Sequence, residues 1–186
     1  MNLLVIGTGY VGLTTAVSFA MQGHQVTGID VNEEKVKLLQ QGKSPIYEPL
    51  LEPELQRALE QGTLAFSTEI AEHMAEADVI YLCVGTPSGS DGFADLRYLE
   101  RAVETLRTFL HGCTKEYVIV IKSTVPIGTS DRIAATFATN KHVHIVTNPE
   151  FLREGRALQD SLEPSRIVIG ADRKEAIAIM DQLYAK

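Results

Sequence analysis

Residues 3–12 of this chain read LLVIGTGYVG, a short apolar run that leads into three glycines spaced as GxGxxG. A run of this length that ends in glycine is typical of a buried strand. Small and apolar residues then recur at helical spacing from Tyr10 to Gln22, and Gly23 ends the pattern. The motif therefore lies between a predicted strand and a predicted helix, the context in which it indicates a dinucleotide site.

Each glycine of the motif meets a different steric requirement. Gly7 permits the tight turn, Gly9 lets the backbone approach a pyrophosphate, and Gly12 lets the helix pack closely on the strand. The N-terminus of the helix would present free N–H groups to the phosphates. The alternative is a structural turn that binds no ligand.

The second predicted strand, Gln25–Ile29, ends at Asp30, close to the spacing of about 20 residues expected after Gly12. A carboxylate here can accept hydrogen bonds from the adenosine ribose and would repel a 2′-phosphate, so the predicted cofactor is NAD rather than NADP. Asp30 could instead cap the helix predicted over Asn32–Gln40, and both roles can coexist. Lys35 could reach the same ribose or the phosphates.

Strands and helices alternate along the rest of the chain. This alternation predicts a doubly wound, mainly parallel α/β sheet, a Rossmann-type NAD-binding domain that spans residues 1–186. The further predicted strands are Leu64–Phe66, Asp78–Val84, Tyr117–Ile121, His142–Val146 and Ile167–Ile169. The further predicted helices are Glu54–Gln61, Leu96–Leu110, Ser130–Ala138 and Lys174–Tyr184, with an irregular, proline-rich loop over Ser44–Pro53.

The composition excludes several classes of protein. Hydrophobic residues make up 45% of the chain and the net charge is −7, without a basic cluster, which argues against a nucleic-acid binder. No apolar run approaches the ~18 residues of a membrane span, and we expect neither a signal peptide nor a membrane partner. Cys83 and Cys113 lack metal-ligand spacing, so we expect no metal and a reducing, cytoplasmic location.

Three predicted strands run into loops that carry a hydroxyl or carboxylate and a proline. These loops are Gly85–Pro87, Lys122–Pro126 and Thr147–Glu150. Ligands of open α/β sheets bind beyond the carboxyl ends of the strands. We therefore expect the loops to form the walls of one site, although well-formed turns would have the same composition.

Glu150 and Glu154 are spaced for one helical face, provided that Asn148 caps a turn that begins at Pro149. Paired carboxylates beside a cofactor suit proton transfer or activation of water. A solvated acidic face, balanced by nearby arginines, is the alternative.

Taken together, four motifs resemble those of the UDP-glucose/GDP-mannose dehydrogenase family. They are the glycine motif at 7–12, CVGTP at 83–87, KSTVPIG at 122–128 and NPEFLREG at 148–155. The stretch PSRIVIG at 164–170 looks more like the UDP-glucose 6-dehydrogenases than the GDP-mannose enzymes.

The resemblance implies a four-electron oxidation in which the sugar C6 alcohol becomes a carboxylate and two NAD molecules are reduced. By motif position it implies cofactor contacts at Tyr10, Val11, Asp30, Lys35, Thr86, Thr124 and Glu154. It implies a water held by Thr124, acid–base chemistry at Glu150, and activation of the hydrolytic water by Glu154. It also implies a binding site for a nucleotide sugar, which we expect to be UDP-glucose. Part of the wall of that site would be formed by Glu150, Phe151, Leu152, Arg153 and Glu154.

The chain also departs from the family pattern. The catalytic-cysteine motif, the lysine–asparagine pair of the linking helices and the second nucleotide-binding-like domain are absent from these residues. We therefore expect them to bind NAD without turnover, with Cys83 behaving as a small hydrophobe. Leu50 stands where relatives often carry glycine, which predicts a local change in the loop backbone.

Two other functions remain open. The chain could belong to a dehydrogenase of another nucleotide sugar, such as GDP-mannose or a UDP-N-acetylhexosamine, or be a stand-alone NAD-binding regulatory module. The resemblance implies a homo-oligomer for the full-length enzyme.

Overall fold

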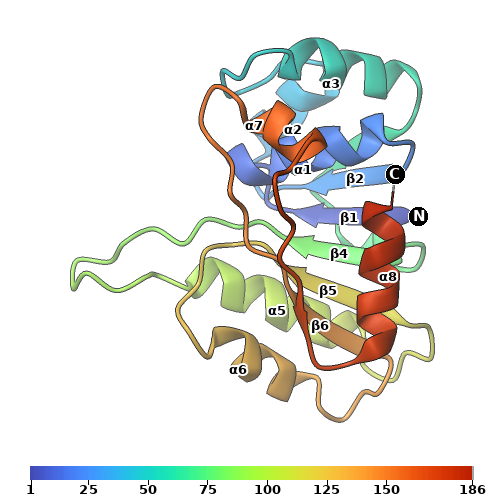
Figure 1. The fold of residues 1–186 in the computed structure, drawn as a ribbon, viewed down its shortest axis with the longest axis vertical. Coiled ribbons are helices and arrows are strands. Elements are labelled where there is room, and N and C mark those ends of the chain that lie inside the picture. The colour runs from blue at the N-terminus through green and yellow to red at the C-terminus, as the bar shows by residue number, and fades with distance from the viewer. Residues whose placement is uncertain (186) are drawn as a thin grey trace.

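The centre of the computed structural model, which describes residues 1–185, is a seven-stranded sheet in the order β3-β2-β1-β4-β5-β6-β7 (Figure 1). The first six strands are parallel, and β7 pairs antiparallel with β6. The strands are β1 (Asn2–Ile6), β2 (Gln25–Ile29), β3 (Leu64–Ser67), β4 (Val79–Leu82), β5 (Tyr117–Ile121), β6 (Val143–Thr147) and β7 (Gly170–Ala171). The order reverses direction between β1 and β4, which is the switch point of a doubly wound sheet. The predicted fold class is confirmed.

Helices cover both faces of the sheet. They are α1 (Tyr10–Met21), α2 (Glu33–Gln40), α3 (Leu51–Glu60), α4 (Ala71–Met74), α5 (Arg97–Phe109), α6 (Thr129–Thr136), α7 (Ala157–Leu162) and α8 (Lys174–Tyr184). One core cluster joins the sheet to α1, α2, α3, α7 and α8, and a second joins it to α4, α5 and α6. Strand β5 shows the division: Val118 and Val120 belong to the first cluster, and Ile119 and Ile121 to the second.

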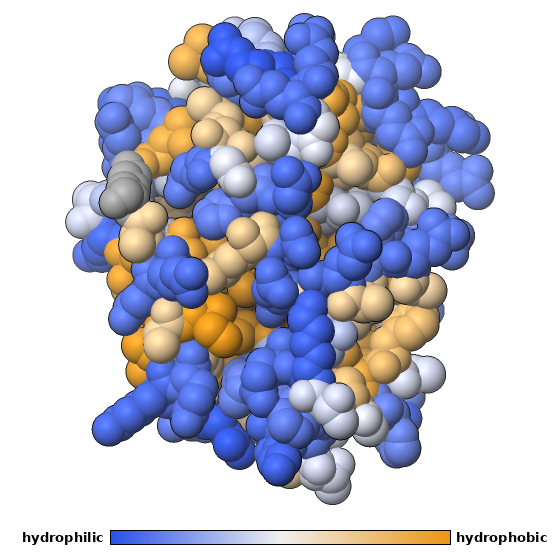
Figure 2. Space-filling view, turned by 90° about the vertical axis from the view of Figure 1, so that its right-hand side faces the viewer, coloured by the Kyte–Doolittle hydropathy of each residue, from blue (hydrophilic) through white to orange (hydrophobic). Residues whose placement is uncertain are grey.

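The carboxyl ends of the parallel strands meet at one edge of the molecule. Figure 1 shows the arrowheads of β1, β2, β4 and β5 pointing to this edge, away from both chain termini. Figure 2 views the opposite side, where hydrophilic side chains predominate and apolar atoms show between them. No helix among residues 1–185 is long and apolar enough to cross a membrane.

Some element boundaries differ from the sequence-based predictions. Helix α3 begins at Leu51, inside the stretch predicted to be irregular, because Pro53 occupies its first turn, where proline is tolerated. The strand predicted over Ile167–Ile169 is displaced to the two residues of β7, and α7 was not predicted.

Leu50 has a left-handed backbone with φ of 66°, the only positive φ of a non-glycine residue among those described. Leucine here adopts a conformation that glycine favours. The local change in the loop backbone relative to the relatives stays a prediction. The Leu50 side chain is 72% exposed, so little packing offsets the strain.

We expect Leu50→Gly to raise the free energy of unfolding by about 1 kcal/mol, because the left-handed conformation costs a residue with a Cβ roughly 1–2 kcal/mol and the flexibility of glycine cancels part of the gain. Urea denaturation measures the change. Leu50→Ala keeps the Cβ and should show no gain; equal stability of the glycine and alanine variants would contradict the interpretation.

Candidate functional site

The glycine loop after β1 brings two of its three glycines, Gly7 and Gly12, into close contact with the chain. A Cβ on Gly12 would lie 1.8 Å from the carbonyl oxygen of Gly7, and one on Gly7, whose φ is +92°, would lie 2.7 Å from the oxygen of Cys83. A Cβ on Gly9 would meet nothing within 4 Å. Gly7 and Gly12 are thus required by packing, whereas the space beside Gly9 is open.

Helix α1 begins directly at this open space. Gly9 is its N-cap residue, with no side-chain capping hydrogen bond and no acidic residue in the first turn. Gly9, Tyr10 and Val11 therefore leave the N-terminal N–H groups of the helix facing the sheet edge without an anionic neighbour in that turn. Such an end favours a bound anion.

Asp30 ties the end of β2 to the glycine loop. Its Oδ2 accepts hydrogen bonds from the Thr8 backbone N (3.0 Å), the Thr8 hydroxyl (2.8 Å) and Lys35 Nζ (2.6 Å). Burial alone would raise the pKa of Asp30, but hydrogen bonds from Lys35, Thr8 and Asn32 outweigh burial and hold that pKa below its usual value. The cap of α2 is Asn32, which accepts from the Lys35 backbone N, so Asp30 does not serve as the helix cap.

The loops after β4, β5 and β6 lie at the same edge, because these strands are neighbours in the sheet. The Thr86 hydroxyl donates to the Thr124 carbonyl oxygen (2.7 Å), and the Ser123 hydroxyl donates to the Val84 carbonyl oxygen (2.7 Å). Thr124 itself is exposed. The structure thus brings the first two predicted loops into direct contact.

The loop after β6 differs from its prediction. Asn148 is buried and does not cap a helical turn: its Oδ1 accepts from Tyr184 (2.7 Å) and Lys122 (3.3 Å), and its Nδ2 donates to the Val168 carbonyl oxygen. Residues 148–153 are not helical, so Glu150 and Glu154 do not share a helix face. The prediction failed because the amide of Asn148 is used by partners distant in sequence.

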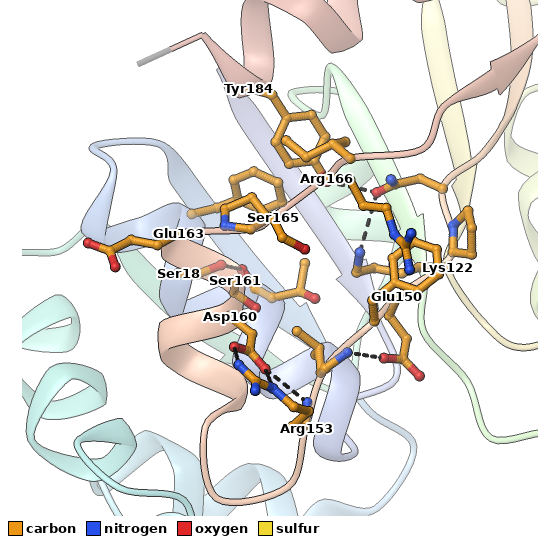
Figure 3. Close-up of a pocket in the computed structure, with 18 residues that line it drawn as sticks. Ser18, Lys122, Glu150, Arg153, Asp160, Ser161, Glu163, Ser165, Arg166 and Tyr184 are labelled. Atoms are coloured by element: carbon orange, nitrogen blue, oxygen red, sulfur yellow. Dashed lines mark hydrogen bonds and ion pairs between the residues drawn. The ribbon is translucent and has the colours of Figure 1, made fainter.

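A cavity of about 340 Å³ opens beside this loop, between α1, α7 and residues 163–167 (Figure 3). Four residues implied by the resemblance line it: Glu150, Phe151, Leu152 and Arg153. Glu154 and Thr124 are not among the lining residues, and both are exposed.

Charged side chains in the cavity are held in different ways. Arg153 forms a bidentate pair with Asp160 (Figure 3). The Arg166 guanidinium instead lies over the Phe151 ring, 4.7 Å from its centroid. Burial lowers the pKa of Lys122, whose amine donates to Asn148. The sequence assigned no role to Asp160 or Arg166, although Arg166 lies within the stretch PSRIVIG at 164–170 that resembles the UDP-glucose 6-dehydrogenases.

Glu48 is a further residue that the sequence did not single out. It is buried and accepts from the Tyr10 hydroxyl (2.5 Å) and from the backbone N atoms of Gly155 (2.9 Å) and Ala157 (2.7 Å). Burial, then the hydrogen bond to Glu48, raises the pKa of Tyr10 to about 12. Glu48 lies between Pro45 and Pro49 in the sequence, and this position does not predict any of these partners.

The two cysteines differ in burial. Cys83 is buried, and this burial raises the pKa of its thiol to about 12. Cys113 is partly buried and accepts a hydrogen bond from Asn140. Neither forms a disulfide, and the residues that the structure describes include no group of three or more His, Cys, Asp or Glu side chains placed to hold a metal.

A doubly wound sheet with a glycine-rich turn at its switch point and an acidic residue at the end of β2 defines a Rossmann-type dinucleotide-binding domain. The chain belongs to the UDP-glucose/GDP-mannose dehydrogenase family: the NAD binding domain of that family matches residues 1–186. Its cofactor is accordingly NAD, and the family resemblance read from the four motifs is confirmed.

Individual relatives agree with this assignment. The chain is 41% identical to a UDP-glucose 6-dehydrogenase of Pseudomonas aeruginosa, over 100% of this chain and 42% of that protein. It superposes with a TM-score of 0.92 and 43% identity on a UDP-glucose dehydrogenase of Pyrobaculum islandicum, covering 98% of this chain and 43% of the other. A GDP-mannose dehydrogenase of P. aeruginosa gives 0.94 at 34% identity, over 99% and 44%. The chain thus spans less than half the length of these relatives.

The carboxylate of Asp30 should make folding sensitive to acid. Its pKa is lowered in the folded protein, so it stabilises the fold above the unfolded value of about 4, and this contribution is lost as the pH falls through the folded pKa. We expect Asp30→Asn to be destabilised near neutral pH and the difference from the parent to shrink in acid. Urea denaturation across that range measures it; a constant difference would contradict the assignment.

Proposed function

We propose that this chain is the NAD-binding part of a UDP-glucose 6-dehydrogenase, an enzyme that oxidises UDP-glucose to UDP-glucuronate with two NAD and water, a step in polysaccharide biosynthesis. One observation carries the proposal. The glycine loop, Asp30 and the three strand-end loops converge on one sheet edge, beside a cavity lined by residues 150–153.

The cofactor side is supported by the fit of the glycine loop. The open space at Gly9 is a cradle that a single Cβ would enter, and it adjoins the N–H groups of α1. In this proposal Gly7, Gly9, Tyr10, Val11 and Gly12 hold the pyrophosphate.

The remaining cofactor contacts come from the neighbouring strand ends. Asp30 and Lys35 bind the adenosine ribose. Thr86, Thr124 and Glu154 lie beside the nicotinamide. Bound NAD supplies the hydride acceptor, and the residues of this chain orient it and exclude water.

The substrate side is supported by the cavity. Glu150, Phe151, Leu152 and Arg153 would form part of the nucleotide-sugar wall. The Arg153–Asp160 pair keeps that arginine in one orientation, which fixes the shape of the wall. Glu150 would exchange protons with substrate, while Thr124 and Glu154 would hold and activate water.

Residues 1–186 alone should bind NAD without turnover. The second oxidation in the family needs a thiolate nucleophile, and Cys83 is buried, which raises the pKa of its thiol to about 12 even though the Lys122 amine lies near enough to lower it. NADH production from UDP-glucose by the purified chain would overturn this statement.

The sugar nucleotide is the less constrained part of the proposal. UDP-glucose is favoured by the 41% and 43% identity to two UDP-glucose dehydrogenases, against 34% for the GDP-mannose enzyme and 30% for a UDP-D-ManNAc dehydrogenase of Pyrococcus horikoshii. A stand-alone regulatory module is less favoured, because a sensor of NAD has no need of a cavity lined by Glu150 beside the cofactor edge. We further propose that the full-length enzyme is cytoplasmic and forms a homo-oligomer.

Gly9→Ala separates ligand binding from folding. Because a Cβ there meets nothing within 4 Å and the Gly9 backbone (φ −74°) suits alanine, we expect the free energy of unfolding to change little. We expect NAD affinity to fall at least about tenfold, since the methyl group enters the pyrophosphate cradle. Calorimetric titration and urea denaturation measure the two quantities; unchanged NAD affinity in the folded variant would refute the assigned role of Gly9.

Asp30→Asn tests cofactor selection. The substitution removes the charge that repels a 2′-phosphate and frees Lys35, so the ratio of NADP to NAD affinity should rise about tenfold or more. Parallel calorimetric titrations with both dinucleotides give the ratio. Glu33→Gln, a neutralisation at the start of α2, is the matched control and should leave the ratio unchanged.

A further inference from the structure

The carboxylate of Glu48 joins three segments that are far apart in the sequence. It lies in the loop before α3, and it accepts hydrogen bonds from Tyr10 at the start of α1 and from Gly155 and Ala157 after β6. Only 6% of Glu48 is exposed, and no cation lies within salt-bridge distance of it among residues 1–185. A buried carboxylate depends on such donors, so the three contacts hold one another in place.

The contacts made by Glu48 and Tyr10 hold the residues on both sides of Glu154 in the chain. The Tyr10 hydroxyl, besides donating to Glu48, lies 3.5 Å from the Arg153 carbonyl oxygen, and the Gly155 N–H donates to Glu48. Both chain neighbours of Glu154 are therefore attached to this network, while Glu154 itself is exposed. Its backbone is fixed and its side chain is left free to face solvent or a ligand.

Tyr10 faces the cofactor loop as well. It is the first residue of α1, so its backbone N–H belongs to the helix end beside Gly9, while its phenol reaches Glu48. The backbone and the phenol of Tyr10 thus lie at the two ends of one residue. If an anion binds this end of α1 more tightly when the phenol contacts Glu48, it favours that contact, and the contact favours the anion to the same extent.

We propose that Glu48 is a positioning residue that, through Tyr10, couples dinucleotide binding at the start of α1 to the placement of the Arg153–Ala157 segment and of Glu154. The inference rests on the proposed function, because it takes the glycine loop as the NAD site and Glu154 as a residue at the meeting point of cofactor and substrate. It predicts that NAD binding orders residues 153–157 even where they do not touch NAD.

Amide hydrogen exchange of the 186-residue chain, with and without saturating NAD, tests this coupling. In the parent we expect NAD to slow exchange at Gly155 and Ala157 by about fivefold or more. Glu48→Gln keeps the size of the side chain but removes its charge, and Tyr10→Phe removes only the hydroxyl; each should abolish most of the slowing. The double variant should lose no more than either single one.

The matched control is Glu52→Gln. Glu52 lies close to Glu48 in sequence and accepts a hydrogen bond from the Ser44 backbone N. Within residues 1–185 it forms no hydrogen bond or ion pair with Tyr10 or with residues 153–157. It should retain the parent's NAD-dependent slowing, which separates coupling from a general loss of charge. Should Glu48→Gln not fold, Tyr10→Phe decides the matter.

Equal NAD-dependent slowing in Glu48→Gln and the parent would overturn the coupling and leave the proposed function standing. NAD binding to the parent without slowing at Gly155 and Ala157 would do the same. No NAD binding by the folded parent would overturn the proposed function itself, and with it the coupling.

Discussion

The structure depends on the close approach of α1 to the turn that follows β1. The space between Gly12 and the carbonyl oxygen of Gly7 is too small for any Cβ. Only this approach allows α1 to pack on the sheet while its N-terminus stays at the carboxyl edge of the strands. Helices α3 and α7 pack on α1 in turn, and α1 and α7 both contribute residues to the lining of the cavity.

The close contact between Gly7 and Gly12 also explains why the fold could be predicted from the sequence. Glycines required by packing recur at fixed spacing between a strand and a helix, and the alternating pattern that follows fixes the order of elements. Local boundaries were less predictable. Pro53 looks like a loop residue but lies in the first turn of α3, and the two residues of β7 carry too little pattern to locate.

The site was predictable only where its chemistry is local. Asp30 and the strand-end loops follow from sheet polarity, because parallel strands end at one edge. Glu48 and Asn148 could not be assigned in this way. The hydrogen bond from Gly155 to Glu48 spans 107 residues, and Asn148 pairs with Val168, so their roles exist only once the chain is folded.

Buried polar groups of the site share one arrangement. Asp30, Glu48 and Asn148 each connect a strand end or loop to a segment from elsewhere in the chain, and each is satisfied by two or more hydrogen bonds. Leaving such groups unpaired in the interior is costly, so each acts as a positional constraint as well as a contact. The site is rigid where its backbone is held by these groups, and open where Gly9 and Glu154 face the edge.

The two ends of the sheet have a consequence for solubility. An edge strand exposes unpaired N–H and C=O groups that can recruit another chain. Here β3 has four residues and β7 only two, and β7 runs antiparallel along β6. The five-residue strands β1, β2, β5 and β6 thus all lie inside the sheet, and short outer strands are one of the ways in which proteins limit β-pairing between molecules.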